Sequence, residues 1–348
     1  MSTVVAIAFT PSPAADSPNL HSAAKDPLRT FHSLINLCFS SLRRWNPELT
    51  LVLVTTMSPG VNLERQLNEL DADILLTPFS HEPPPGFFPT FNASLFSIDA
   101  LACLAKTYAE PTDRIVLLDP DVVCCGSLEH VFNSIPQSGF LTYDTEYDPD
   151  YLCQGLSAVT AAELHKQLDP TLNGLPRHYG GELYGFNASS WHTISARVEE
   201  SWKFSLYQWR NKLPRFVTEE HLMNYALRYT TTVSAEPYIR RIWTAPTSEP
   251  CVQATYLSRY GICQLKKTAG LQRCNRSPET LSRGSGRRLC RTGATGRQPT
   301  SAFLGGTPKD CCGISQQIFC AVLRLLQASG APASKFPNLL TKLVFPHF

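Results

Sequence analysis

Hydrophobic residues in the first part of the chain form short runs that alternate with stretches of helical periodicity. Four runs are mostly apolar, as in buried strands: 4–9, 49–56, 73–76 and 114–119. Between them, apolar side chains recur at helical spacing over 28–45, 61–69 and 94–109. Strands of this kind, separated by helices, predict a mainly parallel sheet with helices on both faces. Ligands bind such sheets beyond the carboxyl ends of the strands, so the functional edge is expected at Thr10, Thr55 and Asp119.

The pattern becomes looser after Asp121 but continues to about residue 243. It predicts strands at 139–144 and 179–187 and helices at about 161–168 and 190–212. A further helix is expected to begin after Thr218, a good N-cap residue, with Glu219 and Glu220 where acids suit the positive end of the helix dipole. Segments within 230–235 and 238–243 are expected to form a last strand pair.

Composition changes at about residue 247. From residue 251 onward there are 14 Lys or Arg residues but 2 Asp or Glu residues, together with seven of the 12 cysteines. We therefore expect a folded domain over 1–246 and an irregular, basic, Cys- and Arg-rich tail over 247–348, with an isolated helix near 314–329. A changed reading frame would explain the tail. The alternative is a basic segment that binds anionic lipid or nucleic acid, although no nucleic-acid partner is expected for the protein.

The whole-chain composition suits a soluble globular protein, since 43% of residues are hydrophobic and 17% are charged. The apolar run 4–9 is too short for the core of a signal peptide and has no basic flank. No run of about 18 apolar residues is long enough for a transmembrane segment. Cysteines adjacent at 124–125 and 311–312 suit neither ordinary disulfides nor a zinc site. A cytoplasmic protein with reduced thiols is therefore expected.

A pair of carboxylates, Asp119 and Asp121, follows the apolar strand at 114–119. In extended backbone, alternate residues share a face, so both side chains could converge on one point at the ligand-binding edge. Two hard oxygen ligands suit Mn²⁺ or Mg²⁺, which fills its other positions with phosphate and water oxygens. The alternative is that Asp119-Pro120-Asp121 is only a turn, because Asp and Pro are favoured turn residues.

The residues around this pair resemble a known family. The segment RIVLLDPDVVCCGSLEHVF resembles the signature of GT-A glycosyltransferases, in particular the group that contains glycogenin and bacterial lipopolysaccharide galactosyl- and glucosyltransferases. There, Asp-x-Asp is followed by a Gly-x-Leu element, which Gly126 and Leu128 fill here. Weaker likenesses occur in the family's order at 41–47, 185–189 and 218–224. The resemblance covers roughly residues 3–245 and implies a Rossmann-like α/β/α sandwich.

The same resemblance implies the reaction and the binding partners. The expected activity is transfer of a hexose from a nucleotide-diphosphate sugar, with retention of configuration, to an unknown acceptor that is a saccharide, a lipid-linked group or a protein. By analogy, Asp119 would contact the ribose and the metal, and Asp121 the metal and the diphosphate. Phe9 and Thr10 are expected to contact the nucleotide, and Asn187 the donor sugar.

Three acids are expected near the reacting carbon: Glu182, Glu219 and Glu220. Their alternative role is structural, as a strand acid and as acids of a helix N-terminus. Two departures from the family pattern reduce the expected activity. Ser94 stands where the family usually has Arg or Lys. The family's third metal ligand is a His late in the domain, and the only His after Trp243 is His347.

Two other functions fit parts of the pattern. Phosphatases of the haloacid dehalogenase type carry Asp-x-Asp-x-Thr/Val after an apolar strand and use the first Asp as nucleophile, which would be Asp119 here. That motif normally lies near the N-terminus, whereas three strands precede it in this chain. The non-enzymatic alternative is a catalytically impaired protein that binds a nucleotide sugar without turning it over.

Overall fold

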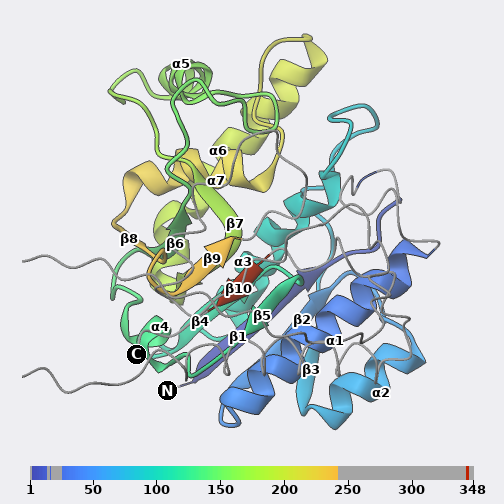
Figure 1. Cartoon of the computed structure of the whole chain (residues 1–348). Coiled ribbons are helices and arrows are strands. Elements are labelled where there is room, and N and C mark those ends of the chain that lie inside the picture. Colours follow the sequence, from blue (N-terminus) through green and yellow to red (C-terminus); the bar gives the residue numbers. More distant parts are fainter. Residues whose placement is uncertain (1, 14–15, 17–25, 242–341, 345–348) are drawn as a thin grey trace, which may run out of the picture. The chain divides into compact units, whose positions relative to one another are not determined.

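The computed structural model describes residues 2–13, 16, 26–241 and 342–344 (Figure 1). The expected helix near 314–329, His347 and most of the expected tail therefore lie outside the described residues, whereas Lys342–Val344 of that tail is described and forms a strand. None of the described helices is both long and apolar enough to cross a membrane.

Seven strands form the central sheet in the order β3-β2-β1-β4-β7-β6-β8. Their bounds are β1 (Thr3–Phe9), β2 (Thr50–Thr55), β3 (Ala72–Leu76), β4 (Arg114–Leu118), β6 (Phe140–Asp144), β7 (Tyr179–Phe186) and β8 (Thr232–Ser234). Only β7 runs against its neighbours β4 and β6, and every other pair in this sheet is parallel. The prediction of a mainly parallel sheet is confirmed.

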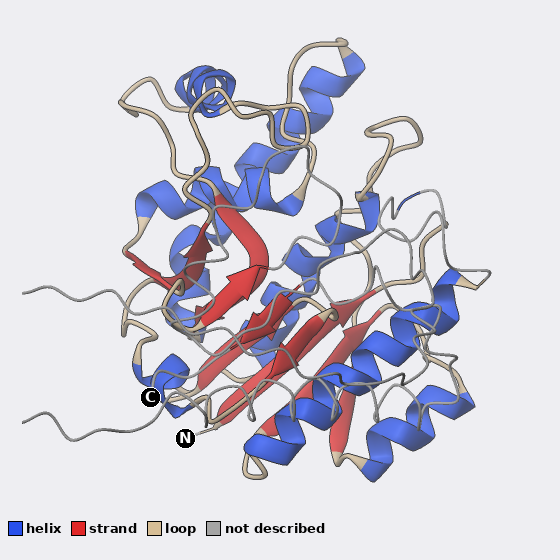
Figure 2. Cartoon of the chain, viewed as in Figure 1, coloured by secondary structure: helices blue, strands red, loops and turns tan. Residues whose placement is uncertain are grey.

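Helices lie on both sides of this sheet (Figure 2). The α-helices are α1 (Pro27–Trp45), α2 (Val61–Glu69), α3 (Phe96–Thr107), α4 (Glu129–Asn133), α5 (Ala158–Leu168), α6 (Ala188–Arg210) and α7 (Glu219–Ala226), and the 3₁₀ helices are η3 (Asn92–Leu95) and η4 (Leu227–Tyr229). Val5 and Ile7 of β1 pack in one core with side chains of α1, α2 and α4. Val4 and Ala6 pack in a second core with α3, α6 and α7. Because alternate strand residues face opposite sides, these two cores establish the expected three-layer α/β/α sandwich.

The end of α1 holds the segment that follows the aspartate pair. Asn46, which ends the helix, donates from Nδ2 to the Gly126 carbonyl (3.1 Å) and accepts the Leu128 N–H at Oδ1 (2.7 Å). One turn earlier, the Ser41 hydroxyl accepts the Cys124 N–H (2.9 Å). These side-chain bonds fix the Gly-x-Leu element against the helix.

A second, three-stranded sheet has the order β5-β10-β9, with β5 (Val122–Cys124), β9 (Ile239–Arg241) and β10 (Lys342–Val344). The expected pairing of the strands within 230–243 is therefore wrong, because β8 pairs with β6 and β9 pairs with β10. The buried Ala235 donates its N–H to the Thr142 carbonyl on β6 (2.8 Å), which prolongs that pairing. Apolar alternation identified the two strands but could not identify their partners.

Candidate functional site

The aspartate pair lies in a tight turn at the carboxyl end of β4. The Val122 N–H donates to the Asp119 carbonyl (3.3 Å), so residues 119–122 form a β-turn with Pro120 at its second position. The expectation of extended backbone is wrong here, because proline favours that position of the turn. The Asp119 N–H donates to the Glu182 carbonyl on β7 (3.2 Å), which ties the turn to the antiparallel strand.

Both aspartates lie near the same buried thiol. Burial raises the pKa of the Cys38 thiol on α1, and the nearby Cys124, Asp121 and Asp119 raise it further. Two half-buried carboxylates therefore lie within electrostatic reach of one thiol. They offer hard oxygens of the type that Mn²⁺ and Mg²⁺ prefer. The family's third ligand is a His late in the domain, and no residue of this chain is assigned to that role; His347, the only His after Trp243, is outside the described residues.

Three glutamates gather where β7 meets the start of α7. Glu182 is fully buried on β7, and Glu219 and Glu220 form the first turn of α7. Glu220 Oε1 accepts the Gly181 N–H (2.8 Å), and a Cβ on Gly181 would lie 2.7 Å from Glu219 Oε1. Glycine at position 181 therefore lets both glutamates approach the strand backbone.

These acids all lie close enough to Tyr184 to affect its phenol electrostatically. Burial raises the pKa of the Tyr184 phenol, and Glu219, Glu220, Glu182 and Asp119 raise it further. The structure therefore brings the three glutamates and Asp119 within electrostatic reach of one side chain, as expected for a common site. Thr218 occupies the predicted N-cap position, but its side chain does not cap the helix. Its hydroxyl lies 3.3 Å from His221 Nδ1.

Glu219 has the most strongly perturbed carboxyl of this group. Burial, followed by the charge of Glu220, raises the pKa of Glu219 to about 8, while a hydrogen bond from Ser94 opposes the shift and Asp119 adds to it. A neutral carboxyl at pH 7 can donate a proton where an ionised one cannot. Ser94, which replaces a basic residue of the family, therefore lies against this carboxyl group.

Replacing Glu219 with glutamine should stabilise the protein most in alkaline solution. The unfolded carboxyl ionises near pH 4.5 and the folded one near 8, so the folded state binds more protons in between. Stability therefore falls as the pH rises from about 4.5 to 8. Glutamine removes this loss, and we expect Glu219→Gln to raise the free energy of unfolding by about 1–3 kcal/mol at pH 8.5 and little at pH 4.5. Urea unfolding at both pH values measures it, and an equal gain at pH 4.5 would contradict this explanation.

Glu220 is held by a chain of hydrogen bonds that includes His178. The Asn224 amide accepts the Tyr179 N–H at Oδ1 (2.9 Å), which turns its Nδ2 toward His178 Nδ1 (3.2 Å). Since Nδ1 must then accept, the proton of the neutral ring is on Nε2, which donates to Glu220 Oε2 (3.0 Å). The thiol of Cys153 lies 3.8 Å from the same oxygen. The side chain of Glu220 is therefore surrounded by hydrogen-bond donors.

Cys153, His178 and Glu220 are also close enough to share a metal ion, since their ligand atoms lie within 4.8 Å of one another. The Asn224 amide opposes metal binding. A ligating His normally donates its other ring N–H, whereas His178 Nδ1 faces the amide Nδ2 of Asn224 and has to accept. The group is therefore better described as a hydrogen-bonded network around Glu220.

The tautomer of His178 should change when Asn224 is replaced by aspartate. A carboxylate keeps the acceptor for the Tyr179 N–H but places a second acceptor opposite His178 Nδ1. We therefore expect His178 Nδ1 to change from a hydrogen-bond acceptor in the native protein to a donor in Asn224→Asp. Nitrogen-15 NMR of the imidazole distinguishes the two states, and an Nδ1-protonated ring in the native protein would refute the assignment.

The other expected nucleotide and sugar ligands are only partly brought together. Thr10 follows β1 at the same edge as Asp119, and its hydroxyl contacts that of Thr56 (3.0 Å). Phe9 turns its ring into the core, against Phe31 (5.6 Å). A ligand could reach the backbone of Phe9, but its side chain already packs in the core.

Asn187 does not join the carboxylates. The preceding residue on β7, Phe186, pairs with Ile115 at the start of β4. Asn187 and Asp119 therefore lie at opposite ends of these two strands. Its Oδ1 accepts the Ser190 N–H (2.9 Å) as the N-cap of α6, and its Nδ2 donates to the Gln137 carbonyl (2.8 Å). The side chain is therefore occupied by structural hydrogen bonds. Because β7 is antiparallel, its first residues, not its last, reach the functional edge.

Sequence reasoning did not find the residues around Glu220. These are Cys153, His165, His178, His221 and Asn224. Four of them lie on different loops or helices, and no spacing along the chain links them. His221 and Asn224 carried a signal, because both lie in the family-like segment 218–224, and Asn224 follows Glu220 by four residues and so lies on the same face of α7.

Comparisons with known proteins give matches only among solved structures. No family model and no curated protein matches the chain. The galactosyltransferase LgtC, in complex with donor and acceptor sugar analogues, has 12% identity and a TM-score of 0.42, with 66% of this chain and 72% of that chain covered. Mouse xyloside xylosyltransferase 1 has 13% identity and a TM-score of 0.40, with coverage of 65% and 81%.

A third match is WbbM, a bifunctional glycosyltransferase, with 12% identity, a TM-score of 0.43 and coverage of 68% of this chain and 39% of that chain. The three proteins are glycosyltransferases, the class of enzyme that the sequence resembles. A TM-score below 0.5 carries no argument about function, so the activity of this chain must be inferred from its own residues.

Proposed function

We propose that this protein transfers a glycosyl group, a hexose, from a nucleotide-diphosphate sugar to an acceptor in a metal-dependent reaction. The observation that supports it best is the gathering of Asp119 with Glu182, Glu219 and Glu220 where β4 ends and β7 begins. Parallel strands present their carboxyl ends at this edge, where ligands of α/β proteins bind. Residues 1–246 form the catalytic domain in this proposal, and the cytoplasm is its proposed location.

Asp119 and Asp121 would hold Mn²⁺ or Mg²⁺, and their hard carboxylate oxygens fit such an ion. The bound ion would neutralise the negative charge of the diphosphate leaving group. The Asp119 backbone, held by Glu182, fixes the position of the turn. Thr10 lies at the same edge and is available to contact the nucleotide. Were these two carboxylates the only protein ligands, the ion would bind weakly and the activity would be low.

The glutamates divide into two roles. Glu220, which accepts from Gly181 and His178, presents a carboxylate beside the reacting carbon, where it stabilises developing positive charge. Glu219, kept neutral by burial and by its neighbour, holds a proton at the same place. The resemblance to the glycogenin group further implies retention of the anomeric configuration, which proton NMR of the product would read.

A panel of nucleotide sugars tests this function directly. Thermal shift with Mn²⁺ should show stabilisation by one donor, and the same donor should be hydrolysed slowly to nucleoside diphosphate and free sugar. Binding without hydrolysis or transfer would support the impaired, binding-only alternative. No binding by any donor, together with an aspartyl-phosphate on Asp119 after incubation with a phosphate ester, would replace the proposal with the phosphatase.

A further inference from the structure

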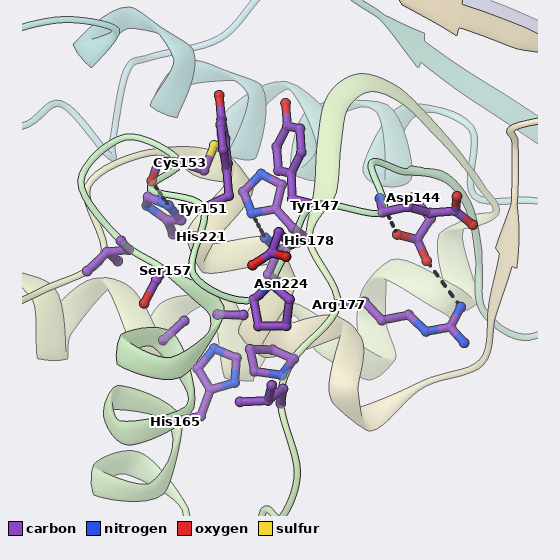
Figure 3. Close-up of a pocket in the computed structure, with 18 of the residues that line it drawn as sticks. Asp144, Tyr147, Tyr151, Cys153, Ser157, His165, Arg177, His178, His221 and Asn224 are labelled. Atoms are coloured by element: carbon purple, nitrogen blue, oxygen red, sulfur yellow. Dashed lines mark hydrogen bonds and ion pairs between the residues drawn. The ribbon is translucent and has the colours of Figure 1, made fainter. Parts of the chain in front are cut away.

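A cavity of about 420 Å³ lies beside the Glu220 network, between the loop at 144–157, the segment at 175–178 and helices α5 and α7. Figure 3 shows its labelled lining residues, among them Asp144, Tyr151, His165 and His178. The volume is within the range of cavities that hold small molecules. His178 lines it and hydrogen-bonds Glu220, so a ligand in this cavity would lie next to the proposed reaction centre.

His165, in the wall of the cavity, has an unsatisfied polar side chain. It is 1% exposed, and neither ring nitrogen has a hydrogen-bond partner in the part of the chain that the structure describes. Burial, followed by Arg228 and His221, lowers the pKa of His165 to about 3, so the ring is neutral. The His165 ring makes edge-to-face contacts with Phe216 and Tyr225, at centroid distances of 5.5 Å and 5.2 Å. A buried donor and acceptor left unpaired destabilise a fold unless a bound group satisfies them.

The mouth of the cavity combines aromatic faces with negative charge. The rings of Tyr147 and Tyr151 lie 4.3 Å apart, and Tyr151 is 48% exposed. Three carboxylates line the same space: Asp144, Glu146 and Asp148. Of the described lining residues, Arg177 is the single Lys or Arg, and its charge is neutralised by Asp144 (3.1 Å). An anionic ligand would be repelled here.

We propose that this cavity binds a neutral carbohydrate, which is the acceptor of the proposed transfer. A sugar carries several hydroxyls, so one can donate to the unprotonated nitrogen of neutral His165 while another accepts from the protonated one, and carboxylates are good acceptors for further hydroxyls. The apolar face of a sugar ring packs on exposed aromatic rings such as Tyr151. The negative rim disfavours phosphorylated and acidic acceptors. The role as acceptor site rests on the proposed function, whereas carbohydrate binding does not.

Binding to the full chain tests the proposal with four probes: maltose and methyl β-D-glucoside as neutral sugars, and glucose 6-phosphate and glucuronate as anionic ones. We expect at least one neutral probe to bind with millimolar affinity and to shift the imidazole nitrogen-15 signals of His165. Both anionic probes should bind at least tenfold more weakly. No binding of either neutral probe at roughly 50 mM, or tighter binding of an anionic one, overturns the proposal.

His165→Phe separates a ligand-binding role from a structural one. Phenylalanine keeps a ring between Phe216 and Tyr225 but removes the two unpaired nitrogens. We expect the melting temperature to rise by roughly 2–4 °C while the affinity for the neutral sugar falls at least tenfold. His192→Phe, at an exposed position on α6, is the matched control and should change neither. Unchanged sugar affinity in folded His165→Phe would refute the site.

The outcomes also separate this proposal from the proposed function. Nucleotide-sugar binding is measured on the same samples with Mn²⁺ and depends on the aspartate turn. If the donor binds but no neutral sugar does, the carbohydrate cavity is wrong and the donor site stands. If neutral sugars bind through His165 but no donor binds, the cavity stands and its role as acceptor site is wrong.

Discussion

Replacing Asp121 with asparagine should lower manganese-dependent hydrolysis of the nucleotide-sugar donor by more than about 100-fold. The removal of a group that merely hydrogen-bonds a metal ligand typically lowers affinity or activity by 10–100-fold, and the loss of a charged ligand should exceed that. Asparagine is nearly isosteric and keeps one carbonyl oxygen, so the change removes charge without removing the turn. Titration of Mn²⁺ against the rate of nucleoside diphosphate release measures both the affinity for the ion and the maximal rate.

Asp113→Asn is the matched control for this experiment. Asp113 precedes β4 at the opposite edge of the sheet and accepts the Ser2 N–H (2.7 Å), a bond that the asparagine oxygen can still accept. The same chemical change at the two ends of one strand should therefore affect activity only at Asp121. Equal activity of Asp121→Asn and the native protein would remove the aspartate pair from the reaction.

Gly139→Ala should destabilise the domain by about 3–5 kcal/mol, a large effect for a single methyl group. Gly139 precedes β6 with φ at +133°, a conformation that residues with a side chain rarely adopt. A Cβ there would lie 2.2 Å from the Thr231 carbonyl oxygen. That oxygen accepts the Phe140 N–H (2.9 Å) where β6 meets β8, so the methyl group would push two strands apart. Chemical denaturation of the two proteins measures the difference.

Gly174→Ala distinguishes the cost of backbone strain from the cost of a steric clash of the added methyl group. Gly174 also has positive φ, at +72°, but an added Cβ would meet nothing within 4 Å. We expect about 1–2 kcal/mol of destabilisation there, the cost of left-handed backbone alone. Similar losses for the two variants would mean that the contact with Thr231 relaxes freely.

The strands and helices of this protein could be predicted because each carries its own periodicity. The runs that form β1, β2 and β4 are apolar on both faces, and α1 ends at Asn46 before a proline, as its sequence indicates. Partner choice was harder, since β8 and β9 are three residues long and any strand edge can satisfy their backbone groups. The strands β8 and β9 join different sheets because of tertiary packing, which the local sequence pattern does not indicate.

The site could be predicted only where its residues lie at strand ends. Asp119 and Thr10 follow from the rule that such edges bind ligands, whereas Glu182 was expected only from its place before a family-like segment. Asn187 was misplaced because a motif match fixes neither the direction of a strand nor the edge at which a residue lies. His165 and His178 come from a helix and a loop, and only the folded chain brings them to one cavity.

The reversal of β7 also affects the order in which the protein folds. The strands β1, β2 and β3 pair with their neighbours along the chain, whereas β4 crosses back to pair with β1, which brings Thr3 beside Arg114. The contact between Asp119 and Glu182 adds a further long-range closure, because it depends on β7 returning antiparallel along β4, and closures of this kind carry a larger entropic cost than the pairing of neighbouring strands. A chain that has folded only its first half would possess the aspartate turn without the glutamates. Ligand-binding competence should therefore be among the last properties that this protein acquires as it folds.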